Sequence, residues 1–294
     1  MAVYNYAEQF TSLLQQKYAI SSKSDFLTKS NPQVQFLNAQ TIKLPSITVS
    51  GYKDHTRTIG FNAGTLSNDW TPKKLEFDRD IEFFIDPMDI DETNLTLSVA
   101  NITNTFEEEQ AIPEKDCYRF SKLYSEASEK SAQISTNVLS ADNFLEWFDE
   151  QMSRMDDAGV PEEGRVLCAT PAMRKIINNA KGIERMIMVN TANSVNRRVH
   201  SLDDVTINSV PSARLKTAYD FSNGFQAAGS AKQINAILIH PSCVVCREKY
   251  SYIKLFTPGH DSRVGDGYLY QNRYFGDLFL LDKKIEGIAM NVEA

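Results

Sequence analysis

Apolar and acidic residues alternate along the segment from Leu75 to Ile85. One face of an extended chain here would carry Leu75, Phe77, Ile81, Phe83 and Ile85, and the other would carry Glu76, Asp78, Asp80 and Glu82. Only Arg79 and Phe84 break the pattern. The period of two residues predicts a β-strand with one apolar and one acidic face.

A second strand is predicted from Thr41 to Tyr52, a run rich in β-branched residues. About twenty polar and Gly-containing residues separate it from the alternating segment, so the sequence predicts an extended hairpin with a loose tip. An isolated two-stranded hairpin is barely stable in water. We therefore expect this one to lie on its own domain or on a neighbouring subunit, although an edge hairpin on an ordinary sheet explains the pattern equally well.

After the predicted hairpin, apolar residues recur at the spacing of a helix. Asp89 or Asp91 can cap a helix, and the apolar positions are Leu95, Val99, Ile102 and Phe106, then Cys117, Phe120, Tyr124 and Ala127. Pro113 lies between the two sets and interrupts or kinks the helix. The two segments, collinear or sharply angled, would form a spine of about 35 residues.

The rest of the chain mixes helices and strands. A helical stripe comprises Phe144, Trp147, Phe148, Met152 and Met155, and Gly159-Val160-Pro161 ends it. A short strand from Arg165 to Ala169 leads into a helix that Thr170 caps and Pro171 begins. Further strands are predicted at 234–240, 250–256, 268–274 and 278–281. Residues 1–40 read as an arm with one short helix, and the whole pattern indicates an α/β or α+β protein.

Composition excludes several classes of protein. In 294 residues, 42% are hydrophobic and 23% charged, and no apolar run approaches the roughly 18 residues that span a membrane. The start has no secretory pattern, and four scattered cysteines favour folding in a reducing cytoplasm. A formal net charge of −7 argues against a protein whose main task is to grip nucleic acid.

Charge is unevenly distributed. Acid gathers between Glu76 and Asp116, whereas the segment from Arg247 to Lys284 is comparatively basic. Such asymmetry suits subunits that meet acid to base, although two solvated faces explain it equally well.

The search for catalytic chemistry finds little. Cys243 and Cys246 have the spacing of a zinc or redox half-site, but a second pair of ligands is missing, and burial in a packed element is the better interpretation. His260, Asp261 and Asp266 lie in a Gly-rich stretch that reads as a turn between strands. We therefore assign no catalytic, cofactor-binding or metal-binding residue and predict a binding or structural protein rather than an enzyme. A cytoplasmic thiol or zinc enzyme using Cys243 and Cys246 stays open as an alternative.

The chain resembles the major capsid proteins of tailed bacteriophages, the family with the Hong Kong 97-type (HK97-like) fold. The resemblance covers most of the chain and rests on the order and spacing of five segments: FDRDIEFFIDPMDIDETN, IPEKDCYRFSKL, GRVLCATPAMRKII, INAILIHPSCVVCREKYSYIKLFTPG and DGYLYQNRYFGDLFLLDKKIEGI. These segments carry packing patterns and no catalytic residues.

The resemblance implies an α+β fold with four regions. They are an amino-terminal arm (1–40), an extended hairpin loop (41–88), a peripheral domain with the spine helix (89–139 and 235–294) and an axial domain (140–234). It also implies self-assembly through pentamers and hexamers into an icosahedral-type shell of a phage or prophage virion, built in the host cytoplasm around double-stranded DNA. The DNA would be a neighbour by proximity, without sequence-specific contacts.

The expected contacts between subunits follow from the hairpin. Its apolar face would be hidden by a neighbour or by the spine, and its acidic face would meet basic residues. The candidate contact residues are Glu76, Phe77, Asp78, Arg79, Ile81, Glu82, Phe83, Arg119, Arg247, Arg263 and Arg273.

Other partners and alternatives follow from the same family. The short arm implies a separate scaffold protein or a processed chain, and a portal protein is expected. Some members join Lys to Asn between subunits; Lys53, Lys73 and Lys74 lie in the loop, but no catalytic acid can be identified, so crosslinking is not expected. An encapsulin-like compartment that encloses protein cargo shares the fold and is the nearest alternative function.

Overall fold

The computed structural model describes residues 20–29, 41–55, 61–92, 99–181, 199–259 and 265–294. Its helices are α1 (Asp25–Thr28), α2 (Pro87–Glu92), α3 (Val99–Phe106), α4 (Ile112–Glu129), α5 (Phe144–Asp157) and α6 (Pro171–Asn179). None of these helices is long and apolar enough to cross a lipid bilayer.

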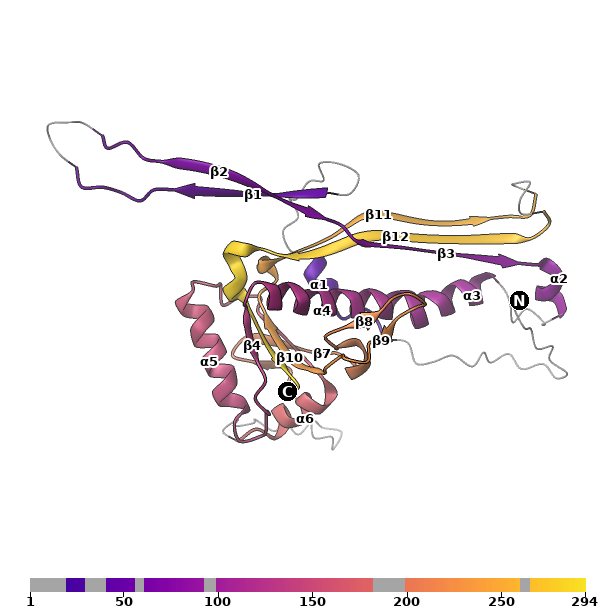
Figure 1. The fold of residues 1–294 in the computed structure, drawn as a ribbon. Helices are drawn as coiled ribbons and strands as arrows, with labels where there is room; N and C mark the ends of the chain where they lie inside the picture. Colours follow the sequence, from indigo (N-terminus) through magenta and orange to yellow (C-terminus); the bar gives the residue numbers. More distant parts are fainter. Residues whose placement is uncertain (1–19, 30–40, 56–60, 93–98, 182–198, 260–264) are drawn as a thin grey trace, which may run out of the picture.

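Within the described residues, the strands form four sheets (Figure 1). A projecting hairpin consists of β1 (Thr41–Val49) and β2 (Leu66–Lys74). A three-stranded sheet has the order β11 (Val244–Phe256), β12 (Tyr268–Leu280) and β3 (Phe77–Ile85). A six-stranded sheet has the order β4 (Gln133–Ser135), β13 (Ile288–Val292), β10 (Ile234–Ile239), β5 (Val166–Ala169), β7 (Val205–Ser209) and β6 (Ser201–Leu202). A small hairpin joins β8 (Tyr219–Asp220) to β9 (Gln226–Ala227), and the α+β class expected from the sequence is confirmed.

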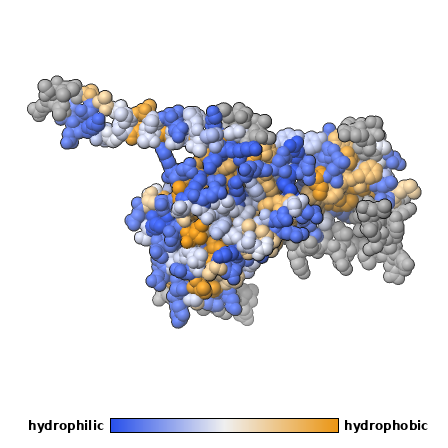
Figure 2. Space-filling model, viewed as in Figure 1, coloured by the Kyte–Doolittle hydropathy of each residue, from blue (hydrophilic) through white to orange (hydrophobic). Residues whose placement is uncertain are grey.

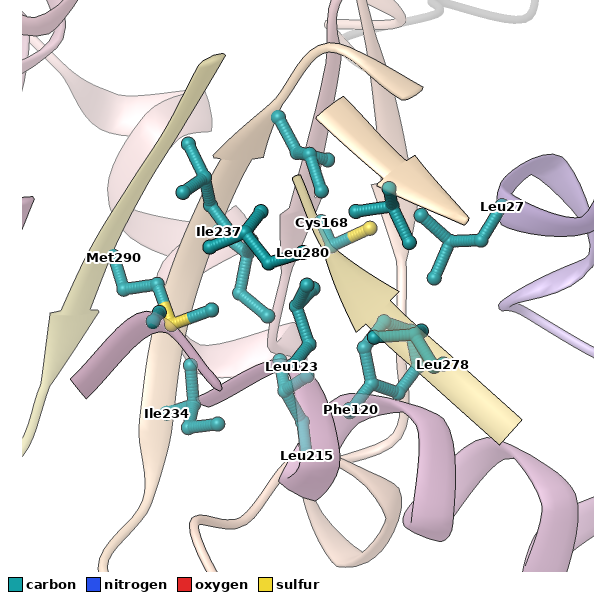
Figure 3. Packing of buried hydrophobic residues seen from close by; sticks show 14 of the residues in the cluster. Leu27, Phe120, Leu123, Cys168, Leu215, Ile234, Ile237, Leu278, Leu280 and Met290 are labelled. Atoms are coloured by element: carbon teal, nitrogen blue, oxygen red, sulfur yellow. The ribbon is translucent and has the colours of Figure 1, made fainter. Parts of the chain in front are cut away.

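The six-stranded sheet is the middle of three layers. Alternate residues of β10 point to opposite faces: Ile237 and Ile239 pack toward α4, and Ala236 and Leu238 pack toward α5 and α6. Figure 3 shows Phe120 and Leu123 of α4 among the side chains of the first of these cores. Because helices cover both faces, β10 is apolar at every position except Asn235.

The spine is one continuous rod made of α3, a π-helical turn at Glu107–Ala111, and α4 (Figure 1). Pro113 has no N–H with which to bond the carbonyl four residues earlier, and its ring crowds that carbonyl. The wider turn relieves this conflict, and the Ile112 N–H donates to the Glu107 carbonyl five residues back. The structure thus selects the collinear arrangement. Leu95, expected in the first segment, lies outside the described residues.

The predicted helix ends are confirmed in the segment that carries α5, β5 and α6. Gly159 adopts φ +71° after α5, where the Val160 N–H bonds the Met155 carbonyl at 2.9 Å. Thr170 caps α6 by accepting a hydrogen bond from the Met173 N–H at 3.2 Å.

The partner of the alternating segment was predicted wrongly. β1 pairs with Leu66–Lys74, whereas the alternating segment forms β3 and pairs with β12. The sequence of β2, LSNDWTPKK, is polar and contains Pro72. Solvent surrounds this strand, so its composition does not indicate a strand. The alternating segment, by contrast, has apolar side chains that the spine buries, which explains why it belongs to the sheet beside α4.

The C-terminal strands are longer than predicted. The segments 268–274 and 278–281 merge into the single strand β12, which continues through Gly276. A Cβ at Gly276 would lie 2.7 Å from the Arg247 carbonyl oxygen and 2.8 Å from the Tyr274 hydroxyl, because β11 bulges between Glu248 and Tyr250. The predicted turn joins β11 to β12, and residues 260–264 of it lie outside the described residues.

Asp116 of α4 fastens the arm to the spine. Its fully buried carboxylate accepts hydrogen bonds from Ser22 Oγ at 2.8 Å, the Lys23 N–H at 2.9 Å and Ser24 Oγ at 2.6 Å. The Arg214 guanidinium supplies the opposite charge at 3.0 Å. Five donors, counting the Ser24 N–H at 3.1 Å, therefore converge on this carboxylate from two distant segments. The described part of the arm contains one short helix, α1, which follows this point.

Replacing Asp116 by Ala should lower the free energy of unfolding by about 3 kcal/mol or more, because it leaves the Arg214 charge buried without its partner. Chemical denaturation of the purified chain measures this loss. Ser22→Ala, which removes one donor, should cost only about 1 kcal/mol. Equal losses in the two variants would show that the carboxylate is not the centre of this contact.

Gly276→Ala should cost about 1–3 kcal/mol of unfolding free energy, since the new methyl group meets backbone that cannot move aside. Gly229→Ala is the matched control, because a Cβ at Gly229 meets nothing within 4 Å. Thermal unfolding of both variants compares them directly, and an unchanged midpoint for Gly276→Ala would contradict the crowding.

Candidate assembly surfaces

The hairpin of β1 and β2 has two chemically different faces. Residues paired across an antiparallel ladder share a face, and the register pairs Pro45 with Trp70 and Val49 with Leu66. One face therefore carries the apolar stripe: Pro45, Ile47, Val49, Leu66, Trp70 and Pro72. All six residues are exposed, and Ile47, Val49 and Leu66 keep 62%, 68% and 73% of their surface.

The opposite face of the hairpin is buried at its base and polar farther out. Ile42 and Leu44 join Leu75, Val245 and Phe279 in a small core that fastens the hairpin to β11 and β12. Beyond this core the face carries Ser46, Thr48, Ser67 and Asp69. Figure 2 shows apolar patches on the projecting hairpin, away from the body of the subunit. Apolar side chains that stand in solvent on a protruding element are typical of an interaction surface.

The apolar residues of β3 are covered by the spine of the same subunit. Phe77 stacks on Tyr118 of α4 with ring centroids 3.8 Å apart, and Phe83 meets Phe106 edge to face at 5.4 Å. Arg79 Nε donates to the Glu114 carboxylate at 2.6 Å. Ile81 is half-buried on the same face. The sequence predicted that either a neighbouring subunit or the spine covers this apolar face. In the structure, the spine covers Phe77 and Phe83.

Asp78 and Glu82 of β3, and Glu76 just before it, also have partners within the subunit. Arg273 donates to both Asp78 oxygens at 2.9 and 2.6 Å, and this hydrogen bonding lowers the pKa of Asp78. Glu82 accepts from the Gln271 amide at 2.6 Å, and Glu76 lies 3.3 Å from Lys122 Nζ. Such exposed pairs contribute little free energy, so a second partner could compete for them.

The remaining basic candidates lie elsewhere. Arg119 is 7% exposed and donates to Ser24 Oγ, so it belongs to the contact between arm and spine. Arg247 is half-buried in β11, opposite Asp277 in the register. Arg263 lies outside the described residues.

A second exposed surface is the face of the three-stranded sheet that points away from the spine. The register places Phe256, Leu269 and Phe84 in one row across its three strands. Tyr250 and Tyr252 stack in parallel on the same face, and Tyr250 keeps 45% of its surface. We call this the outer sheet face. Sequence reasoning missed both this face and the apolar stripe as surfaces, because strand periodicity indicates which residues share a face but not which face solvent reaches.

The thiols that could support catalysis are buried. All four cysteines are buried, and burial raises the pKa of Cys117, Cys168 and Cys243 to about 12 and also raises that of Cys246. Within the described ranges, no three His, Cys, Asp or Glu side chains are grouped to hold a metal ion. A cleft of about 550 Å³ between β3 and the spine is lined by aromatic rings and by the Arg79–Glu114 ion pair.

No family model and no curated protein match the sequence. Solved structures do match its fold over nearly the whole chain. A structure described as the asymmetric unit of the bacteriophage PhiM1 mature capsid aligns with a TM-score of 0.68 at 12% identity and covers 98% of this chain and 91% of that one. A chain from Mycobacterium phage Che8 aligns with a TM-score of 0.65 at 13% identity, covering 99% and 98%.

A third match, the capsid structure of the cyanophage P-SCSP1u, has a TM-score of 0.61 at 11% identity and covers 99% of this chain and 93% of that one. Identities this low establish a likeness of fold alone. The alignments cover at least 98% of this chain and at least 91% of each of the three others. The chain therefore has the fold of chains that build phage capsids, as the resemblance in its sequence implied.

Proposed function

We propose that this chain is the major capsid protein of a tailed bacteriophage or prophage, a structural protein that assembles through pentamers and hexamers into an icosahedral-type shell around double-stranded DNA. The observation that carries the proposal is the projecting hairpin, whose apolar stripe stays exposed in a subunit with the fold of phage capsid chains. A hairpin of this kind is barely stable unless another surface covers it.

The outer sheet face of a neighbouring copy is the surface that fits the stripe. The stripe is apolar and exposed, and the outer sheet face combines exposed aromatic residues, such as Phe84 and Tyr250, with charged ones. The described residues 41–74 contain four Lys and two Asp, a net charge of +2, whereas the outer sheet face carries Asp78, Asp80 and Glu82 against Arg273 and Lys254, a net charge of −1. Burying one exposed Ile or Leu contributes about 1.5–3 kcal/mol before ordering costs.

Such contacts join different surfaces on successive copies. A heterologous contact repeats from subunit to subunit and closes when the rotation between copies permits a ring. Each contact can be weak, because many of them act together in a shell. Glu76, Asp78, Arg79, Ile81, Glu82 and Arg273 of the predicted contact set lie on or beside the sheet that receives the hairpin in this scheme, and their role between subunits is part of the proposal.

The regional organisation is proposed on the same basis. In this proposal, residues 1–40 form the amino-terminal arm and residues 41–88 form the extended hairpin loop. Residues 89–139 and 235–294 form the peripheral domain, and residues 140–234 form the axial domain. The six-stranded sheet contains β4, β10 and β13 together with β5, β6 and β7, so it joins the segments of the peripheral and axial regions. A separate scaffold protein, a portal protein and assembly in the host cytoplasm before incorporation in the virion complete the proposal.

Leu66→Asp should reduce the yield of closed shells at least about tenfold, since a carboxylate placed in the stripe resists burial against the next subunit. Ser67→Asp is the matched control: it adds the same charge at the adjacent exposed position on the opposite face. Negative-stain electron microscopy and light scattering of both variants, expressed with the neighbouring genes, measure the yield.

Both substitutions are on exposed residues, so the thermal midpoint of each variant should stay close to that of the unmodified chain. Equal shell yields from the two variants would contradict the role of the stripe. A discrete monomer or dimer of the unmodified chain, with and without the neighbouring gene products, would contradict the capsid function itself.

A further inference from the structure

The hairpin leaves the three-stranded sheet at a junction of two residues, Leu75 and Glu76. Leu75 is 2% exposed and belongs to the core at the base of the hairpin. The side chain of Glu76 points to solvent, but its backbone N–H does not: it donates to Asp277 of β12. The path of the chain from hairpin to sheet is therefore fixed by a side chain about 200 residues away in sequence.

Asp277 connects three elements at this junction. Its Oδ2 accepts the Glu76 N–H at 2.9 Å, and its Oδ1 accepts the Tyr118 hydroxyl at 2.8 Å and the Leu278 N–H at 2.7 Å. Lys122 of α4 completes the group through its ion pair with Glu76 at 3.3 Å. The spine, the sheet and the hairpin thus meet at one carboxylate.

Opposing effects act on the pKa of the Asp277 carboxylate. Asp277 is 4% exposed, and burial raises its pKa, while the hydrogen bonds from Glu76, Leu278 and Tyr118 and the charge of Lys122 act in the opposite direction. A buried carboxylate is tolerated when donors satisfy it and is costly when they are lost. The Glu76 N–H is therefore kept pointing at β12, and the directions of the strands on either side of it follow.

The other contacts at the base restrain the hairpin less specifically. The core of Ile42, Leu44 and Leu75 is apolar, and apolar contacts have no preferred direction. Lys283 Nζ donates to the Ile47 carbonyl at 2.7 Å, but it reaches there on a flexible four-carbon stem. Hydrogen bonds to a fixed carboxylate are directional. They therefore define the angle between the hairpin and the three-stranded sheet, which the apolar core and Lys283 do not fix.

We propose that Asp277 is the positioning residue that sets the direction in which the hairpin leaves the subunit. The nine residues of β2 extend about 30 Å, so a tilt of about 10° at the junction would move the far end by about 5 Å, one strand spacing. Such a displacement would bring the apolar stripe to the wrong place on the next subunit. This consequence for assembly rests on the proposed function, whereas the positioning itself is a property of the single chain.

The direction of the hairpin can be measured in the subunit by pulsed electron paramagnetic resonance. Spin labels at Ser67→Cys on β2 and Glu150→Cys on α5 occupy exposed positions, and the four natural cysteines are buried and should not react. Asp277→Asn should shift the mean distance by about 5 Å or broaden its distribution to a similar extent. Asp149→Asn, an exposed change of the same chemistry on α5, should leave the distribution unchanged.

Two milder variants keep the test decisive if Asp277→Asn fails to fold. Tyr118→Phe removes one donor to the carboxylate, and Lys122→Met removes the cation, and each should broaden the distance distribution without changing the secondary structure measured by circular dichroism. A distribution as narrow as that of the unmodified chain in every folded variant would overturn the inference.

Shell formation, measured separately, distinguishes this inference from the proposed function. A displaced hairpin together with irregular or open particles supports both halves of the proposal. A displaced hairpin with shells of normal size and yield overturns the consequence for assembly. If the unmodified chain forms no shells, but its distance distribution is narrow and Asp277→Asn broadens it, the proposed function fails while the positioning role of Asp277 stands.

Discussion

The spine helix packs on two faces, and the rest of the subunit depends on this double contact. Phe120 and Leu123 join the core beneath the six-stranded sheet, while Tyr118 stacks on Phe77 of the three-stranded sheet. The strands of the two sheets are not hydrogen-bonded to each other. Aromatic stacking on one side of the spine and apolar burial on the other hold the two sheets together. The π-helical turn before Pro113 matters for the same reason, because a kink there would separate the Phe83–Phe106 contact from the contacts of α4.

The hairpin contrasts with this well-packed body. Its base is part of a core, but farther out it has neither a third strand nor a covering helix among the described residues. Natural sheets usually protect free edges with charge, proline or covering segments. Here Pro45 and Pro72 limit edge pairing, while Ile47, Val49 and Leu66 stay exposed. The hairpin is thus protected against indiscriminate strand addition while it keeps a face that a specific partner can bury.

Sequence reasoning succeeded where one local rule decides the outcome. The helix ends at Gly159 and Thr170 and the alternation of β3 follow from backbone and periodicity rules that act over a few residues. It failed for the partner of β1, because periodicity identifies the faces of a strand and not its neighbour. Asp116 and Asp277 could not have been singled out either, since each is defined by donors from distant segments that look unremarkable in the sequence.

The order of strands in the six-stranded sheet also bears on when the subunit can form. β13 lies between β4 and β10 and contributes Met290 and Val292 to the core under the spine. The sheet therefore cannot be completed until residues 288–292 have left the ribosome, and folding must wait for pairings between segments far apart in the chain. Newly synthesised chains lack a finished core until these residues have emerged. Their hairpins cannot be presented on a rigid body before that point.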